Sequence, residues 1–154
     1  MVLNGVKMNF SGEYNVSIDL KGRVSIPATF REELRDVYQS DRIVVTIFKD
    51  GLVAYPPARW ADICAKVDAL KPGPLKDANQ RNRIAPAQEC LFNKQGRIQV
   101  PQALREHADL LKDAVVIGMS DKIEIWNLQA HQNIRQESEA VLEENAQAQA
   151  DLGF

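Results

Sequence analysis

The sequence predicts an α+β fold with a mainly β core, in which two repeats of one chain interlock and helices lie at the periphery. The first observation is an internal duplication, because residues 19–32 return as residues 93–106 at a constant offset of 74 (93 − 19). The second is an alternation of apolar and polar residues beside each copy, which is typical of half-buried strands. The third is an apolar content of 45% over 154 residues, which favours one shared core over two small ones.

The duplicated stretch matches position by position. It reads Asp19-Leu-Lys-Gly-Arg-Val-Ser-Ile-Pro27 in the first copy and Asn93-Lys-Gln-Gly-Arg-Ile-Gln-Val-Pro101 in the second. So many matches in one frame indicate a true repeat. Apolar residues replace apolar ones where Val24, Ile26 and Phe30 return as Ile98, Val100 and Leu104. The identical residues are Gly22, Arg23, Pro27, Arg31 and Glu32, which recur as Gly96, Arg97, Pro101, Arg105 and Glu106.

Each copy predicts a strand, a tight basic loop, a second strand and a short helix. Residues 13–18 alternate in polarity and form the first strand. In the loop, Asp19 can accept hydrogen bonds from the backbone amides that follow it, while Gly22 can supply a positive φ. Arg23 then leaves the loop with its guanidinium facing outward, and Pro27 starts the helix.

A pair of further strands follows each copy. Residues 43–48 form a buried run, and residues 52–55 return after a turn that contains glycine. The second half repeats this arrangement with strands at residues 115–119 and 123–126. Both pairs predict hairpins that contribute to the β core.

Helices are predicted between and after the repeats. Pro56-Pro57 open a helix that residues 71–74 end. Residues 75–84 are polar, which predicts a solvated connector, with phosphate contacts from its basic residues as the alternative. Residues 128–149 predict a helix whose end frays. The first helix carries an apolar stripe that favours core packing over a cofactor role for its tryptophan: Trp60, Ile63, Val67 and Leu70.

These elements divide the chain into five segments. Residues 1–7 show no pattern, so we expect a disordered extension or a start-site artefact, with Met8 as a possible native start. The segments are an N-terminal extension (1–9), the first repeat (10–59), a helical connector (60–86), the second repeat (87–130) and a C-terminal helix with an acidic tail (131–154).

Charge and cysteine content narrow the function. The net charge is −2, yet the five carboxylates after Arg135 leave residues 1–136 with 19 basic and 16 acidic groups, or +3 (19 − 16). A mildly basic body is compatible with local contact to nucleic acid. Cys64 and Cys90 have no metal-ligand spacing, which favours buried thiols in a reducing cytoplasm and leaves one disulfide as the alternative. We find no signal peptide and no membrane-spanning run, and expect no membrane association.

Catalysis is not expected. His107 and His131 lie on predicted helices without a triad or a metal-ligand pattern, and no phosphate-binding glycine loop or nucleophile elbow occurs. The paired carboxylates at residues 32–33 are explained by ion pairs with Arg31 and Arg35 on the same helix. We therefore expect no cofactor, no metal and no small-molecule substrate.

With both loops in view, the chain resembles the MraZ family of bacterial transcription factors, in the AbrB/SpoVT/MazE class. The match runs from Phe10-Ser-Gly-Glu-Tyr14 through the helix after Trp126. Two departures occur: Asn93 replaces the family's aspartate, and residues 81–84 are more polar than is usual for the family. The other matching motifs are Asp19-Leu-Lys-Gly-Arg23 with Val-Ser-Ile-Pro27, Gln88-Glu-Cys90, Gly96-Arg97-Ile98 and Ile123-Glu-Ile-Trp126.

The resemblance implies a swapped-hairpin, split β-barrel made by two AbrB-like repeats, assembled into rings of identical subunits. It also implies a nucleoid-associated repressor of the division and cell-wall gene cluster, including its own gene, that binds short G-rich repeats in promoter DNA. The alternative is an antitoxin-like module that binds a protein. Antitoxins of this class usually carry one repeat and a disordered tail, whereas this chain has two repeats and a helical tail.

The candidate DNA-binding residues are Lys21, Arg23, Lys94 and Arg97. A planar guanidinium suits phosphate oxygens or the O6/N7 edge of guanine, although an arginine can instead pair a local carboxylate. We favour DNA contact for the two arginines and assign a phosphate contact to Lys21. In the second loop Gln95 stands at the position of Lys21 and removes its charge, and Lys94, one position earlier, restores that charge, so we assign Lys94 the same contact. The candidate loop-organising residues are Asp19, Gly22, Asn93 and Gly96.

Overall fold

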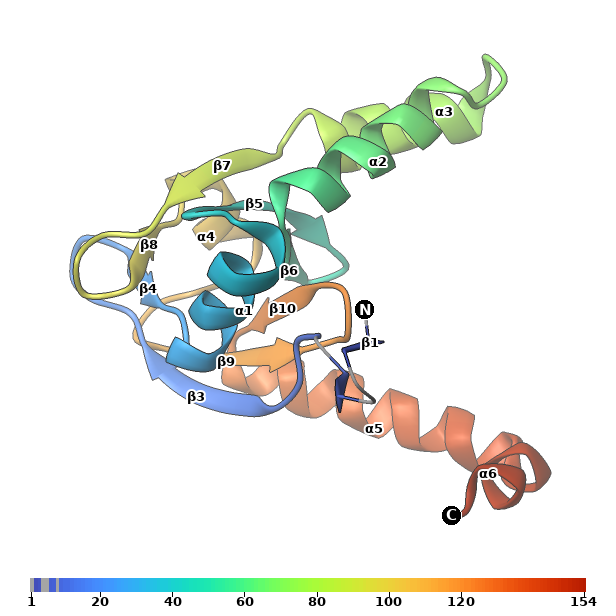
Figure 1. The fold of residues 1–154 in the computed structure, drawn as a ribbon. Helices are drawn as coiled ribbons and strands as arrows, with labels where there is room; N and C mark the ends of the chain where they lie inside the picture. The colour runs from blue at the N-terminus through green and yellow to red at the C-terminus, as the bar shows by residue number, and fades with distance from the viewer. Residues whose placement is uncertain (1, 4–5, 8) are drawn as a thin grey trace.

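The computed structural model describes residues 2–3, 6–7 and 9–154, and the side chains of residues 9–154. It has a mixed α/β architecture with a six-stranded sheet and a small two-stranded ladder at its centre (Figure 1). The prediction of helices around a mainly β core is confirmed. The strands of the large sheet are β3 (Glu13–Ser17), β5 (Arg42–Phe48), β6 (Gly51–Tyr55), β7 (Gln88–Leu91), β9 (Asp113–Gly118) and β10 (Ile123–Trp126).

Strands from the two repeats are interleaved in this sheet. Their spatial order is β3-β9-β10-β6-β5-β7, and all neighbours are antiparallel. β3 of the first repeat pairs with β9 of the second, while β7 of the second repeat pairs with β5 of the first. Neither repeat completes a sheet by itself, because each supplies an edge strand to the other.

The strands that leave the two loops form the small ladder. β4 (Arg23–Ser25) pairs antiparallel with β8 (Arg97–Gln99). Within the described residues, no continuous ladder closes the large sheet into a barrel. Isolated bridges connect the small ladder to the chain just after β3 and β7: Ile18 with Val24, and Phe92 with Ile98.

Helices occur where proline and apolar spacing predict them. Two paired elements, α2 with α3 and α5 with α6, extend to the side opposite the loops (Figure 1). The polar connector is helical and lies on this side of the molecule, away from the loops. The helices are α1 (Ala28–Tyr38), α2 (Pro57–Asp68), α3 (Pro74–Asn79), the π-helix η1 (Gln80–Ile84), α4 (Gln102–His107), α5 (Leu128–Glu144) and α6 (Ala146–Leu152).

Both ends of the chain differ from the expectations. The C-terminal helix breaks at Asn145 but resumes as α6, so the expected fraying is wrong; Gly153, with φ of 109°, ends it. At the other end, β1 (Val2–Leu3) pairs with β2 (Val6–Lys7), so these residues are not an unstructured extension. The expectation for residues 1, 4–5 and 8 lies outside the described residues.

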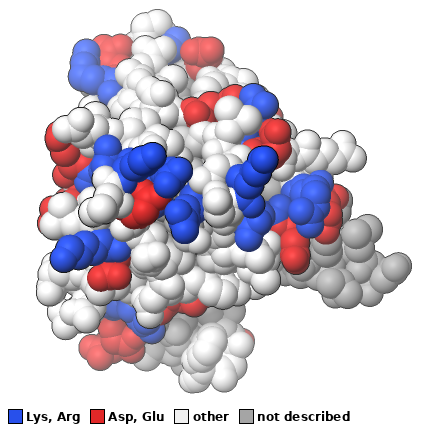
Figure 2. All heavy atoms as spheres, turned by 90° about the vertical axis from the view of Figure 1, so that its left-hand side faces the viewer, with Lys and Arg blue, Asp and Glu red and all other residues white. Residues whose placement is uncertain are grey.

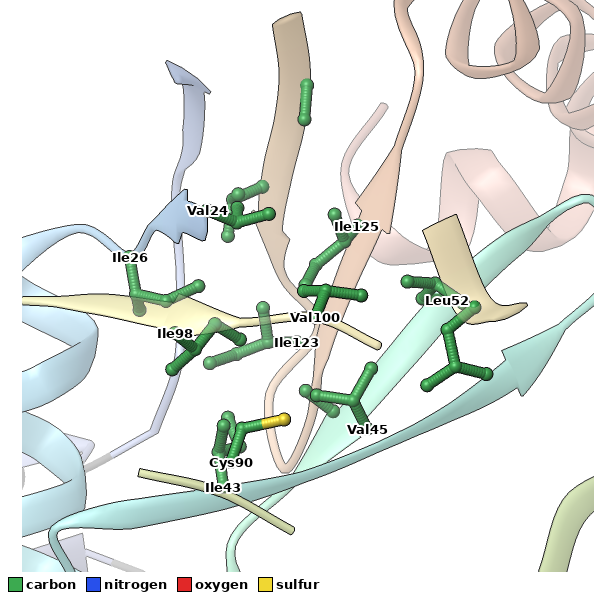
Figure 3. Close-up of a cluster of buried hydrophobic side chains, with 14 of the residues drawn as sticks. Val24, Ile26, Ile43, Val45, Leu52, Cys90, Ile98, Val100, Ile123 and Ile125 are labelled. Atoms are coloured by element: carbon green, nitrogen blue, oxygen red, sulfur yellow. The ribbon is translucent and has the colours of Figure 1, made fainter. Parts of the chain in front are cut away.

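The core joins side chains from both repeats (Figure 3). Val24 and Ile98, which face each other in the small ladder, are both fully buried. Trp60 is half-buried and packs on Tyr55 with ring centroids 5.8 Å apart, as expected for a packing residue. Labelled in Figure 3 are Val24, Ile26, Ile43, Val45, Leu52, Cys90, Ile98, Val100, Ile123 and Ile125.

The two cysteines are separate free thiols. Cys90 is buried in β7, and burial raises the pKa of its thiol to about 11. Cys64 is partly exposed on α2. The expected buried pair is therefore wrong for Cys64, and the alternative of a disulfide is wrong for both.

Candidate nucleic-acid interface

The first loop is held by one side chain and one positive φ. The carbonyl oxygen of Asp19 accepts a hydrogen bond from the Gly22 N–H at 2.9 Å, which closes the turn. Oδ1 of Asp19 accepts two more, from the N–H of Lys21 at 3.0 Å and of Arg23 at 2.9 Å. Gly22 has φ of 80°, a conformation that favours glycine.

The second loop repeats these bonds with an amide in place of the carboxylate. Oδ1 of Asn93 accepts from the N–H of Gln95 at 3.0 Å and of Arg97 at 2.9 Å, and Gly96 has φ of 75°. The two turns have the same shape because an amide carbonyl is as good an acceptor for these bonds as a carboxylate oxygen. Asn93 therefore changes the charge of the loop and leaves its hydrogen bonds intact.

Both loop arginines approach the same carboxylate. Nε of Arg23 lies 2.6 Å from Oδ2 of Asp19, and Nη1 of Arg97 lies 3.3 Å from the same oxygen. The arginine side chains are 33% and 39% exposed, so part of each stays accessible. An arginine has five N–H donors, and the bonds to Asp19 use one from each side chain. Local pairing and contact with a second anion are thus compatible.

Asp19 is strongly biased toward its ionised form. The Arg23 N–H is the largest cause, and with the Arg23 guanidinium and the Lys21 N–H it lowers the pKa of Asp19 from 3.8 to about 2. At neutral pH the candidate residues therefore combine four cations, on Lys21, Arg23, Lys94 and Arg97, with one carboxylate, for a net charge of +3 (4 − 1). A surface with this charge favours anionic partners.

The two loops lie side by side at one end of the molecule (Figure 1). Nε2 of Gln99 donates to the Lys21 carbonyl oxygen at 2.8 Å and so ties the second repeat to the first loop. The side chains of Lys21 and Lys94 are exposed. Figure 2 shows this end face on, with lysine and arginine side chains gathered across its middle and acidic groups between them.

Three residues at this end were not among the candidates. Leu20 is fully exposed at the tip of the first loop. In the sequence, an apolar residue among polar turn residues was the feature that could have pointed to it. Arg31 and Arg105 reach the loops from α1 and α4, and their recurrence in the duplication was the available signal. The ion pairs expected of Glu32 and Glu33 with Arg31 and Arg35 are wrong, since neither glutamate forms one among the described residues. Nε of Arg31 donates to the Ile26 carbonyl oxygen at 3.1 Å, and Arg35 pairs with Asp36.

The histidines lie away from the loops. His107 is exposed, with Nε2 2.7 Å from the Lys49 carbonyl oxygen, and His131 is buried with Nε2 3.5 Å from Oε1 of Glu13. Across the described residues, no cluster of three or more histidine, cysteine, aspartate or glutamate side chains could hold a metal ion. None of the described helices combines the length and apolar character needed to span a bilayer.

Comparison with known proteins identifies the family. The family model described as "MraZ protein, putative antitoxin-like" matches residues 9–81 and 84–152. The chain belongs to the MraZ family. The gap between the two matches, residues 82–83, falls inside η1, so the two MraZ segments follow the two halves of the chain.

Several MraZ relatives match over nearly their whole length. A protein of Syntrophotalea carbinolica named "Transcriptional regulator MraZ" is 46% identical over 150 residues, covering 96% of this chain and 100% of that relative. Proteins of the same name from Halothermothrix orenii and Lactiplantibacillus plantarum are each 39% identical, covering 94% and 93% of this chain and 99% of each relative. The name that these MraZ relatives share denotes a regulator and not a class of enzyme.

Proposed function

We propose that this chain is a transcriptional regulator that binds double-stranded promoter DNA through its two loops. The observation that carries the proposal is the pair of turns with matching hydrogen bonds, side by side at one end of the molecule with a net charge of +3 (4 − 1). DNA presents a dense array of phosphates, and cationic side chains that neutralise them supply most of the binding free energy that does not depend on sequence. The regulator name of its MraZ relatives supports the same function.

The residues divide into two roles. Arg23 and Arg97 contact DNA, because a planar guanidinium can bond guanine O6 and N7 or two phosphate oxygens. Lys21 and Lys94 are exposed beside them and contact phosphates. Four residues keep the turns in shape: Asp19, Gly22, Asn93 and Gly96.

The biological setting follows the family resemblance. We propose that the protein works in the cytoplasm at the nucleoid, as a repressor of the division and cell-wall gene cluster including its own gene, at repeated short G-rich boxes. A single chain offers four loop cations, which makes a ring of identical subunits the natural source of tight binding. The interleaved strands support a swapped-hairpin, split β-barrel. The segments 1–9, 10–59, 60–86, 87–130 and 131–154 are proposed as its divisions.

An antitoxin-like function is the second candidate, because the matching family model carries that word in its description. In that case the chain would bind and block a partner protein. Binding to DNA without any partner separates the two functions. The regulator is expected to bind promoter DNA without any partner protein, whereas an antitoxin-like module acts by binding its toxin.

The test is the affinity of the purified full-length protein for a labelled duplex from upstream of its own gene. Arg23→Ala and Arg97→Ala should each reduce affinity about 5- to 150-fold, because one bidentate base contact contributes roughly 1–3 kcal/mol. Arg135→Ala is the matched control, since Arg135 is an exposed arginine on α5, away from the loops. Unchanged affinity in both loop variants, or equal loss in the control, would contradict the assignment. Thermal unfolding of each variant checks that the fold is retained.

A further inference from the structure

We propose that Arg31 and Arg105 are positioning residues, and that each holds in place the DNA-binding loop of the opposite repeat. The inference rests on the proposed function and extends it. It assigns to the two helix arginines a role that loop-borne residues alone do not fill, namely setting the distance and orientation between the loops.

Each arginine is first fixed within its own repeat. Nε of Arg105 donates to the Val100 carbonyl oxygen at 2.9 Å, and Nε of Arg31 donates to the Ile26 carbonyl oxygen at 3.1 Å. In both cases the acceptor lies five residues earlier, just before the proline that starts the helix. A guanidinium is planar, so a bond at Nε fixes the plane of the whole group.

The guanidinium groups then contact the opposite loops. A Cβ atom built on Gly22 would overlap the guanidinium of Arg105, and one built on Gly96 would overlap that of Arg31. The first contact joins the second repeat to the first loop, and the second joins the first repeat to the second loop. Glycine therefore suits each turn in two ways, since it readily adopts the positive φ and its missing Cβ leaves room for the guanidinium.

Backbone bonds reinforce the same crossing. The Ile26 N–H donates to the Gly96 carbonyl oxygen at 3.1 Å, so Ile26 binds the second loop while its own carbonyl oxygen holds Arg31. On the other side, Gln99 from the second repeat donates to the Lys21 carbonyl oxygen of the first loop. Each loop is thus supported by the repeat to which it does not belong.

In this arrangement Arg31 and Arg105 affect DNA binding through the position of the loops. Arg31 and Arg105 are only half-exposed, and each has Nε engaged and a glycine packed against its guanidinium. Their contribution to binding is the position of the loops, while Arg23 and Arg97 make the contacts. Substituting Arg31 or Arg105 should therefore make one loop more mobile, namely the loop of the opposite repeat.

Hydrogen exchange of the full-length protein tests the crossing directly. In Arg105→Ala, amide exchange should become faster in peptides that cover residues 19–23 and stay unchanged at residues 93–97. In Arg31→Ala the pattern should reverse. Arg35→Ala is the matched control, because Arg35 is exposed on α1 and pairs with Asp36. Faster exchange in the variant's own loop, in both loops equally or in neither would overturn the proposal.

DNA binding provides the second readout. Arg105→Ala should lower affinity about 5- to 150-fold, the effect of losing one base contact of roughly 1–3 kcal/mol. The slope of log affinity against log salt should stay unchanged, whereas loss of a direct phosphate contact would reduce it by about 0.9. Arg105→Lys keeps the charge but lacks the planar group, so it should not restore affinity; full rescue, or a reduced slope, would overturn the positioning role.

The two proposals can fail separately. If the wild-type protein does not bind its upstream DNA, the proposed function is wrong, while a crossed exchange pattern would still support the bracing contacts. If the wild-type protein binds and exchange is not crossed, the further inference is wrong and the function stands. Should Arg105→Ala not fold, Arg105→Lys carries both measurements.

Discussion

Asp19→Asn is the most informative single change at this surface. It removes the one carboxylate that both loop arginines approach, at 2.6 Å from Nε of Arg23 and 3.3 Å from Nη1 of Arg97. The turn should survive, because Asn93 already makes the same two amide bonds in the second loop. The unfolding midpoint should change little, since ion pairs of partly exposed groups contribute little to stability. Charge is therefore altered with the loop shape retained.

The expected effect on DNA binding follows from the charge. The substitution raises the net charge of the candidate residues from +3 to +4, while Asn93→Asp lowers it to +2 (3 − 1). If one charge changes the neutralised phosphates by one, the slope of log affinity against log salt changes by about 0.9. Asp19→Asn should bind more tightly at low salt, and its advantage should shrink about 3.5-fold between roughly 50 and 200 mM salt, because 0.9 × log 4 is about 0.54.

Fluorescence anisotropy with the upstream duplex across this salt range measures both quantities. Asn93→Asp should show the opposite change, and the double variant, which restores the net charge, should return to the wild-type slope. Weaker binding by Asp19→Asn at an unchanged slope would refute the charge argument and assign Asp19 an orienting role toward Arg23.

Three other predictions concern a buried leucine of the core, the stability at low pH and the spacing between DNA boxes. Leu34→Ala, at a fully buried position on α1, should lower the free energy of unfolding by about 2–5 kcal/mol in urea denaturation, and Leu111→Ala, at an exposed leucine, is its control. The lowered pKa of Asp19 means that its contribution to stability, which is small because the ion pair is partly exposed, is present above pH 3.8 and is lost as the pH falls toward about 2; an Asp19→Asn variant that loses the same stability over this range would contradict this. Inserting about half a helical turn between two DNA boxes should cost far more affinity than inserting a full turn of roughly 10–10.5 base pairs, and equal losses in a gel shift would exclude a fixed ring.

The sequence was sufficient for the local elements. Proline and apolar spacing predicted α1 and α2, and alternation predicted β3, because these signals lie within a few neighbouring residues. The turn bonds of Asp19 and Asn93 are equally local, since each acceptor serves amides two and four residues later.

The sequence was not sufficient for contacts between the repeats. Arg97 reaches Asp19 across 78 residues (97 − 19), and Arg105 packs on Gly22, so the candidates could be named but not the carboxylate that two of them share. The short strands β1 and β2 were missed because two residues each are too few to show a period. The predicted helix over residues 128–149 includes the start of α6, but its break at Asn145 and its end at Leu152 were missed, because the alanines and glutamines there give no apolar stripe.

The exchange of edge strands also governs how this chain is made. β3 ends at Ser17, whose partner in β9 is Asp113, so 96 residues (113 − 17) must be synthesised before the strand can begin to pair. At roughly 5–20 residues per second, the ribosome needs about 5–20 s for that stretch. Until then the first half of the nascent chain carries a strand without its neighbour, a form open to chaperones and proteases. A chain that ends before residue 113 therefore cannot complete the sheet. Folding is completed only once the second repeat has left the ribosome.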